Sequence, residues 1–239
     1  MAAAKLKYKR ILLKLSGEVL QGDKDGGIDF KMVRALCQEV AEVQKLSVQI
    51  AIVIGGGNIW RYRDSKDSGV ERVTSDYMGM LATIMNSMAL QDQFEKLGIG
   101  APIGSAISMP IVVGTYLRPK ALDYLKKGKI LICAGGTGNP YFTTDTAGAL
   151  RAMELNCDIM LKATKVDFIY DKDPHKYKDA KKFTHLSYNE VLSRELGVMD
   201  LTAVSLCLEK KLPIMVFNLH KKGNIARVVM GENVGTLIN

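Results

Sequence analysis

Several features that mark common classes of protein are missing from this sequence. No apolar run is long enough to cross a bilayer, because Lys14 and Glu18 interrupt the apolar N-terminal stretch, and no cleavage site for export follows it. The four cysteines lie far apart, each in an apolar segment, which disfavours a disulfide framework or a Cys-rich metal site. We therefore expect a soluble cytoplasmic protein with reduced core cysteines and no membrane partner.

Familiar catalytic and nucleotide-binding signatures are also missing. There is neither a G-x-x-x-x-G-K-S/T run nor a G-x-G-x-x-G run after a strand. The three histidines, His175, His185 and His220, lie in late polar segments, which disfavours Ser-His-Asp chemistry. The net charge is +8, but the basic residues are spread along the chain without an RNA-binding signature, so we expect no nucleic-acid partner.

What the sequence does contain is an alternation of short β-branched runs and longer segments with helical periodicity. The predicted strands are 8–16, 48–56, 129–136, 157–164 and 212–218, and the predicted helices are 29–46, 75–97, 144–155, 200–210 and 224–230. This alternation predicts an α/β fold, a three-layer α/β/α sandwich with a mainly parallel central sheet. Because no repeat or linker divides the chain, we expect a single domain spanning 1–239.

Four polar or glycine-rich loops follow predicted strands: 14–17 (KLSG), 55–58 (GGGN), 135–145 (GGTGNPYFTTD) and 162–174 (KATKVDFIYDKDP). Ligands of parallel sheets bind at the carboxyl ends of the strands. Glycines let backbone N–H groups approach a ligand, and Thr143 and Thr144 add hydroxyls at the positive end of a helix. The loop 135–145 therefore predicts a cradle for an anion.

Charged residues in and near these loops favour phosphoryl transfer, in which positioning and neutralisation of the transferred group supply most of the effect. Lys14, Arg61, Lys162 and Lys165 would supply positive charge, and Asp145 could orient the lysines and Mg²⁺ carried in with ATP. A ribose acceptor and a helix-dipole partner are equally good interpretations of Asp76.

The predicted helix 75–97 carries an apolar stripe of Met78, Leu81, Met85 and Met88. A stripe of this kind is more typical of a protein core or a subunit interface than of a ligand-binding surface.

Seven segments together resemble one known family. They are KLSGE, GGGNIWR, SDYMGMLATIMNS, AGGTGNPYFTTD, LKATKVD, VMDLTA and RVVMGENVGTLI, in a match that runs from about Lys9 to Ile238. In this combination the sequence resembles the bacterial UMP kinases, a group within the amino acid kinase family. The resemblance implies the amino acid kinase fold and transfer of the γ-phosphate of ATP to UMP, with Mg²⁺, to give UDP for pyrimidine nucleotide synthesis.

The resemblance also implies roles for individual residues. The phosphoryl-transfer centre would contain Lys14, Arg61, Asp145 and Asp200, with Lys162 or Lys165 as a further cation. The ATP-binding residues would be Lys14, Leu15, Ser16, Gly17, Gly57, Arg61, Thr164, Tyr170 and Asp173. The UMP-binding residues would be Gly56, Asp76 at the ribose, Thr137, Gly138, Asn139, Pro140, Tyr141, Phe142, Thr143 and Thr144. The predicted anion cradle would then hold the acceptor nucleotide.

Regulation and assembly follow from the same resemblance, which implies a homohexamer activated by GTP and inhibited by UTP. The loop of Gly22, Asp23, Lys24, Asp25, Gly26 and Gly27 matches in position the region associated with GTP activation. The sequence departs from the usual family pattern at Trp60, where phenylalanine is usual, at Tyr62 and Arg63, which follow Arg61 in place of glycine, and at Phe168, where glycine is usual.

Two alternative functions compete with this interpretation. The first is a kinase of the same fold that acts on another small acceptor such as N-acetylglutamate or carbamate, against which the segment GTGNPYFTTD argues. The second is a uridine-nucleotide sensor that keeps the pocket but not turnover, which the presence of Lys14, Arg61, Asp145 and Asp200 disfavours.

Overall fold

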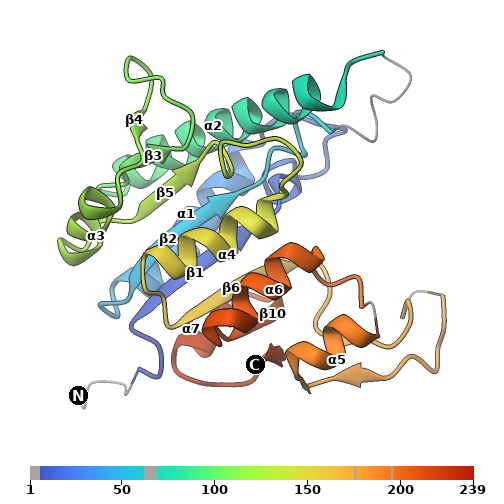
Figure 1. Ribbon diagram of the computed structural model, residues 1–239. Coiled ribbons are helices and arrows are strands. Elements are labelled where there is room, and N and C mark those ends of the chain that lie inside the picture. Colours follow the sequence, from blue (N-terminus) through green and yellow to red (C-terminus); the bar gives the residue numbers. More distant parts are fainter. Residues whose placement is uncertain (1–5, 62–68, 175, 195) are drawn as a thin grey trace.

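The central feature of the fold is a mainly parallel sheet (Figure 1). The computed structural model describes residues 6–61, 69–174, 176–194 and 196–239. Its main sheet contains β1 (Arg10–Leu15), β2 (Gln49–Ile54), β3 (Ile103–Ser105), β4 (Gly114–Thr115), β5 (Leu131–Ala134), β6 (Ile159–Thr164), β9 (His185–Leu186), β10 (Ile214–Asn218) and β11 (Gly235–Ile238). The strand order is β4-β3-β5-β2-β1-β6-β10-β11-β9, and all neighbours are parallel except β10 and β11.

Helices cover both faces of this sheet. One layer is formed by α1 (Phe30–Gln44), α2 (Arg72–Lys96) and α7 (Asn224–Val229), and the other by α3 (Arg118–Lys126), α4 (Thr144–Glu154), α5 (Tyr188–Ser193) and α6 (Leu201–Lys210). The layer with α4 and α6 lies in front of the strands in Figure 1. The 3₁₀ helix η1 (Gly17–Leu20) follows β1, and β7 (Ile169–Tyr170) pairs with β8 (Lys182–Phe183) in a separate small sheet. The predicted α/β/α sandwich is confirmed.

The central strands are apolar on both faces because each face packs on a helix layer. Along β1, Ile11 and Leu13 pack with the layer of α1, α2 and α7, whereas Leu12 between them packs with the opposite layer. All three side chains are fully buried, and each contributes roughly 1.5–3 kcal/mol relative to an exposed position. This two-sided burial explains the continuous apolar runs in the sequence.

All five predicted strands and all five predicted helices are present. Short elements such as β3, β4 and α3 were not predicted from the sequence. The strands β3 and β4 are only 3 and 2 residues long, too short to show a period of two. The helix α3 buries only Ala121 and Leu125, so its apolar face is weak in the sequence. The helix α2 begins at Arg72, three residues before the predicted start at Ser75. The prediction missed the first turn because that turn shows no apolar periodicity.

The apolar stripe on α2 is largely on the surface. The residues Leu81, Met85 and Met88 are 46%, 54% and 43% exposed, which excludes the core interpretation for these three side chains. Neither α2 nor any other helix in the described part of the chain is long and apolar enough to cross a membrane.

The sheet topology brings the predicted ligand loops together. The strands β5, β2, β1 and β6 are consecutive parallel neighbours, so their carboxyl ends lie at one edge of the sheet. The loops that begin after Leu15, Ile54, Ala134 and Thr164 therefore meet at this edge, where parallel sheets bind ligands.

Candidate active site

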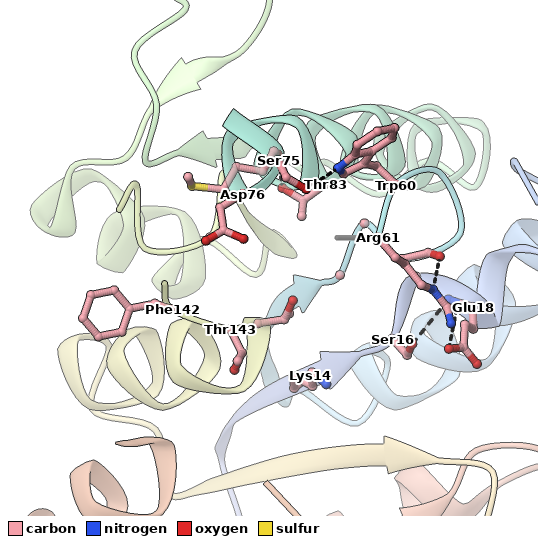
Figure 2. A pocket seen from close by; sticks show the side chains of 18 of the residues that line it. Lys14, Ser16, Glu18, Trp60, Arg61, Ser75, Asp76, Thr83, Phe142 and Thr143 are labelled. Atoms are coloured by element: carbon pink, nitrogen blue, oxygen red, sulfur yellow. Dashed lines mark hydrogen bonds and ion pairs between the residues drawn. The ribbon is translucent and has the colours of Figure 1, made fainter. Parts of the chain in front are cut away.

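A cavity of about 520 Å³ opens at this edge of the sheet. Its volume falls in the usual range for small-molecule sites. Figure 2 shows Asp76 and Phe142 on one side of the cavity, Ser16, Glu18 and Arg61 on the opposite side, and Lys14 between them. The lining residues are Lys14, Ser16, Gly17, Glu18, Gly55, Gly56, Gly57, Trp60, Arg61, Arg72, Ser75, Asp76, Gly79, Met80, Thr83, Gly136, Asn139, Phe142, Thr143 and Thr144.

Two glycines are required for the close packing of the loops around this cavity. A Cβ atom at Gly17 would lie 2.4 Å from Oδ1 of Asn58 and 2.7 Å from the carbonyl oxygen of Gly55. A Cβ atom at Gly56 would lie 2.5 Å from the carbonyl oxygen of Gly79 on α2. The loops after β1 and β2 therefore pack backbone to backbone, which leaves their N–H groups near the cavity.

The start of α4 forms one wall of the cavity. Thr143 caps the helix by accepting hydrogen bonds from the N–H groups of Asp145 and Thr146 at 3.0 and 3.3 Å. Its hydroxyl donates to Asp200, which also accepts from the Thr146 hydroxyl and caps α6 through the N–H of Ala203. Asp200 therefore stabilises the wall from behind, one hydrogen bond away from the cavity.

A buried group of three charges lies beneath the cavity floor. Asp145, in the first turn of α4, forms an ion pair through Oδ1 with Nζ of Lys14 at 2.7 Å, and its Oδ2 accepts a hydrogen bond from Nζ of Lys162 at 2.5 Å. All three side chains are about nine-tenths buried. We call this group the inner bridge. Since Lys14 lies on β1 and Lys162 on its neighbour β6, the register of the sheet places both ammonium groups beside the helix terminus.

Burial and the neighbouring charges both shift the pKa values of Asp145 and Lys162 in the inner bridge. Burial alone raises the pKa of Asp145, but the ammonium groups of Lys14 and Lys162 outweigh burial and hold this pKa below its usual value. Burial lowers the pKa of Lys162; Asp145 opposes this effect and the charge of Lys14 adds to it. The carboxylate is therefore ionised at neutral pH, and the bridge presents an excess of positive charge toward the cavity.

A second carboxylate joins two cations at the rim. In η1, Oε1 of Glu18 lies 2.5 Å from Arg61, and Oε2 lies 2.8 Å from Nζ of Lys165. We call Glu18, Arg61 and Lys165 the outer bridge. The sequence analysis assigned no role to Glu18, although this residue lies within the KLSGE segment. Its position directly after the predicted ligand loop 14–17 could have indicated that it lies at the site.

Asp76 organises the side of the cavity opposite Arg61. Its Oδ2 accepts from the backbone N–H of Tyr141 at 2.8 Å and pairs with Arg72 one helical turn earlier. Tyr141 has φ of 71°, a conformation that costs a non-glycine residue of order 1 kcal/mol, and the bond to Asp76 helps to hold it. Phe142 lines the cavity and is half exposed, so that a planar base can stack on its ring, and the neighbouring Tyr141 is exposed as well.

The structure shows the contacts of two of the three departures from the family pattern, Trp60 and Phe168. Nε1 of Trp60 donates to Oγ of Ser75 at 2.8 Å, a bond that phenylalanine could not make, and so ties the loop after β2 to the first turn of α2. The Phe168 ring lies 4.7 Å from Nζ of Lys182 beside the β7–β8 pair. Tyr62 and Arg63 lie outside the described residues.

Not every predicted site residue lines the cavity. Leu15 is fully buried beneath it, and the Thr164 hydroxyl is bonded to the carbonyl groups of Val166 and Phe217 at the end of β6. The other predicted residues outside the lining are Thr137, Gly138, Pro140, Tyr141, Asp145, Lys162, Lys165, Tyr170, Asp173 and Asp200. Thr137 and Asn139 bond to each other within the glycine turn, and Tyr170 lies in β7, away from the acceptor side.

The loop predicted to respond to GTP contacts the site through a buried amide pair. Asn58 donates to the carbonyl oxygen of Gly27 at 2.8 Å and accepts from the side chain of Asn86 at 2.7 Å. Asn86 also donates to the carbonyl oxygen of Gly55 in the glycine loop. The side chains of Asn58 and Asn86 therefore connect Gly27 to Gly55 in the cavity wall, and a movement of Gly27 would disturb this connection.

A larger hollow, of about 710 Å³, lies over α1 and is distinct from this site. Its lining includes Met32, Leu36 and Glu39, and the Glu39 carboxylate accepts from the N–H of Gly223 just before α7. Its lining contains neither Lys14 nor Arg61 and none of the glycines that follow β2 and β5, so we place the candidate active site in the smaller cavity.

Glycine loops, helix-terminal hydroxyls and lysines gathered at the ends of parallel strands define an α/β phosphotransferase. The model of the amino acid kinase family matches residues 9–218, and the chain belongs to that family.

Three solved structures of similar sequence extend this result. The UMP kinase from Bacillus anthracis is 37% identical, with 97% of this chain and 96% of that chain covered and a TM-score of 0.95. The UMP kinase from Ureaplasma parvum is 34% identical, with 98% and 100% covered and a TM-score of 0.92. The uridylate kinase from Archaeoglobus fulgidus is 27% identical over 96% and 99%, with a TM-score of 0.75. The resemblance to bacterial UMP kinases is confirmed.

Proposed function

We propose that this protein transfers the γ-phosphate of ATP to UMP and releases ADP and UDP. The observation that carries the proposal is the cavity itself, which has Arg61 on one side, Lys14 in the middle, and on the other side the carboxylate of Asp76 and the ring of Phe142. The similarity to UMP kinases supports the choice of acceptor.

The proposed reaction uses the two sides of the cavity differently. The ATP phosphates lie against Ser16, Gly17 and Gly57, and adenosine extends toward Thr164 and Tyr170. UMP lies against the glycine turn and Thr143, with its ribose hydroxyls at Asp76. Lys14 and Lys162, held by Asp145, neutralise the charge that develops on the transferred group, and the positive end of α4 adds to this field.

Mg²⁺ fits this arrangement as an ion that arrives with ATP. Among the described residues, no three acidic, histidine or cysteine side chains gather as metal ligands. Magnesium is commonly held by substrate phosphates and one or two carboxylates, and Asp145 and Asp200, beside the start of α4, are the carboxylates that would assist it at the proposed transfer centre. The ion supplies further neutralisation of the phosphates.

We also propose a homo-oligomer, a hexamer by the family resemblance, in which the exposed stripe of Leu81, Met85 and Met88 on α2 is covered by another subunit. GTP activation and UTP inhibition are proposed on the same resemblance, with Gly27 and Asn58 as the link between the loop 22–27 and the cavity.

A cytoplasmic location is proposed from the cysteines. All four are free and buried, and burial raises the pKa of Cys37 and of Cys133 to about 12, so these thiols stay protonated and unreactive.

The test is the release of ADP from Mg-ATP by the purified protein with UMP, CMP, dUMP or N-acetylglutamate as acceptor. We expect release that depends on UMP, with little from the other three compounds. Release with N-acetylglutamate would instead indicate a different acceptor, and UMP binding without release would indicate a nucleotide sensor.

A further inference from the structure

We propose that Glu18 is a positioning residue of the phosphoryl-transfer site, whose carboxylate holds Arg61 and Lys165 in place for the ATP phosphates. The proposal rests on the proposed function, because it concerns the same site.

The geometry of the outer bridge joins three loops through one side chain. Glu18 follows the loop after β1, Arg61 ends the glycine loop after β2, and Lys165 begins the loop after β6. Each carboxylate oxygen has its own cation, at 2.5 Å for Arg61 and 2.8 Å for Lys165. Glu18 therefore fixes the relative position of two cations that come from separate segments of the chain.

The orientation of Arg61 is set from two directions. Its Nε donates to the carbonyl oxygen of Gly57 at 2.5 Å while its terminal nitrogen donates to Glu18. Both Glu18 and Arg61 line the cavity, and their side chains are only 30% and 23% exposed. The guanidinium is thus held at the cavity wall in one orientation, and a planar guanidinium in a fixed orientation can bridge phosphate oxygens.

The charge state of Glu18 suits this role. The hydrogen bond from Lys165 is the largest cause that holds the pKa of Glu18 below its usual value; burial opposes it and Arg61 adds to it. Glu18 is therefore ionised at neutral pH. Ion pairs with exposed partners such as Lys165, whose side chain is 66% exposed, contribute little to stability, so the value of the outer bridge lies in positioning.

Two effects of Glu18 on ATP binding oppose each other. A carboxylate near a polyphosphate repels it, but two cations already neutralise this carboxylate, so the repulsion is small. Without Glu18, both long cationic side chains would have to be ordered when ATP binds, which weakens binding by roughly tenfold. We therefore expect the loss of order to dominate.

The first experiment compares Glu18→Gln with Glu42→Gln by isothermal titration calorimetry with Mg-ATP and, separately, with UMP. Glu42 is the matched control, because it pairs with Lys45 on the exposed face of α1 and its side chain is 69% exposed. We expect Glu18→Gln to bind ATP about tenfold more weakly and UMP unchanged. The control variant should bind both nucleotides as the wild type does. Equal or tighter ATP binding by Glu18→Gln would overturn the proposal.

A second experiment separates positioning from a general structural effect. If Glu18 acts through its partners, the effect of Glu18→Gln on ATP affinity should shrink in a Lys165→Met background, whereas independent roles would give additive losses. Lys165→Met alone removes an exposed side chain, so it also tests the outer bridge if Glu18→Gln does not fold. A positioning role would be contradicted if Glu18→Gln lowered both the ATP affinity and the melting temperature and if the affinity losses of Glu18→Gln and Lys165→Met added fully in the double variant. These measurements need no acceptor turnover, so their outcome is distinct from failure of the UMP kinase reaction.

Discussion

The inner and outer bridges use the same device in two different environments. In each, one carboxylate joins two cations from separate segments, but the Asp145 side chain is 12% exposed whereas Glu18 and Lys165 are 30% and 66% exposed. Removing one member of a buried set of charges leaves the others without a partner, which typically lowers the free energy of unfolding by about 3 kcal/mol or more. Exposed ion pairs contribute only about 0–1 kcal/mol to that free energy. We therefore expect the inner bridge to serve both the fold and the proposed reaction, and the outer bridge to serve mainly the placement of nucleotide.

The largest effect expected from this comparison is that of Asp145→Asn. We expect kcat to fall by about a thousandfold, because the lysines lose the anion that holds them beneath the transferred phosphate. The free energy of unfolding should fall by about 3 kcal/mol, since two buried ammonium groups would lose the carboxylate that neutralises them. Steady-state ADP release and chemical denaturation measure the two effects, and near-normal activity would remove Asp145 from the transfer centre.

A smaller effect is expected on the acceptor side from Asp76→Ala. The KM for UMP should rise by roughly tenfold to a hundredfold, because charge-assisted hydrogen bonds contribute about 1.5–3 kcal/mol each. The KM for ATP should change little, since Asp76 lies across the cavity from Glu18 and Arg61. Equal increases in both KM values would contradict a ribose role and would mean that Tyr141 and the glycine turn had moved as a whole.

Both bridges should lose their contribution to stability on acidification. The pKa of each carboxyl is lower in the folded protein than its ordinary value of 3.8 for Asp145 or 4.5 for Glu18. Each therefore contributes stability that is present above the ordinary value and is lost as the pH falls through the lowered one. We expect the stability difference between wild type and Asp145→Asn to persist at pH 4.5 and to shrink below 3.8. A difference that grows on acidification would reverse the assigned direction of the shift.

The smallest effect is expected from Trp60→Phe, which removes one hydrogen bond to Ser75. The free energy of unfolding should fall by about 1 kcal/mol, and Ser75→Ala should act on the same bond. In a double-mutant cycle the two losses should not add, because they remove the same contact. Fully additive losses would show that the bond does not tie the glycine loop to α2.

Much of this molecule could be predicted from sequence because its central strands and long helices carry strong apolar periodicity. The five main strands and the loops that follow them were placed correctly, and parallel topology then brought Lys14, Arg61, Asp76 and Thr143 around one cavity. Short elements such as β3, and the weakly amphipathic α3, lacked enough residues to show a period.

The pairing of charges could not be predicted, because it depends on side-chain reach across strands. The choice between Lys162 and Lys165 illustrates this limit. In sequence they are only three residues apart, Lys162 within β6 and Lys165 directly after it, yet Lys162 pairs with Asp145 and Lys165 pairs with Glu18. The burial of Asp145, and hence its expected contribution to stability, was equally absent from the sequence pattern.

The most direct test of the account is to follow the reaction of Mg-ATP with UMP by ³¹P NMR. Direct transfer predicts that the γ-phosphate signal of ATP is replaced by the signals of ADP and of the β-phosphate of UDP in equal amounts, only when UMP is present. Formation of inorganic phosphate without UDP, or an unchanged ATP spectrum in the presence of UMP, would contradict the assignment of this site to phosphoryl transfer between the two nucleotides.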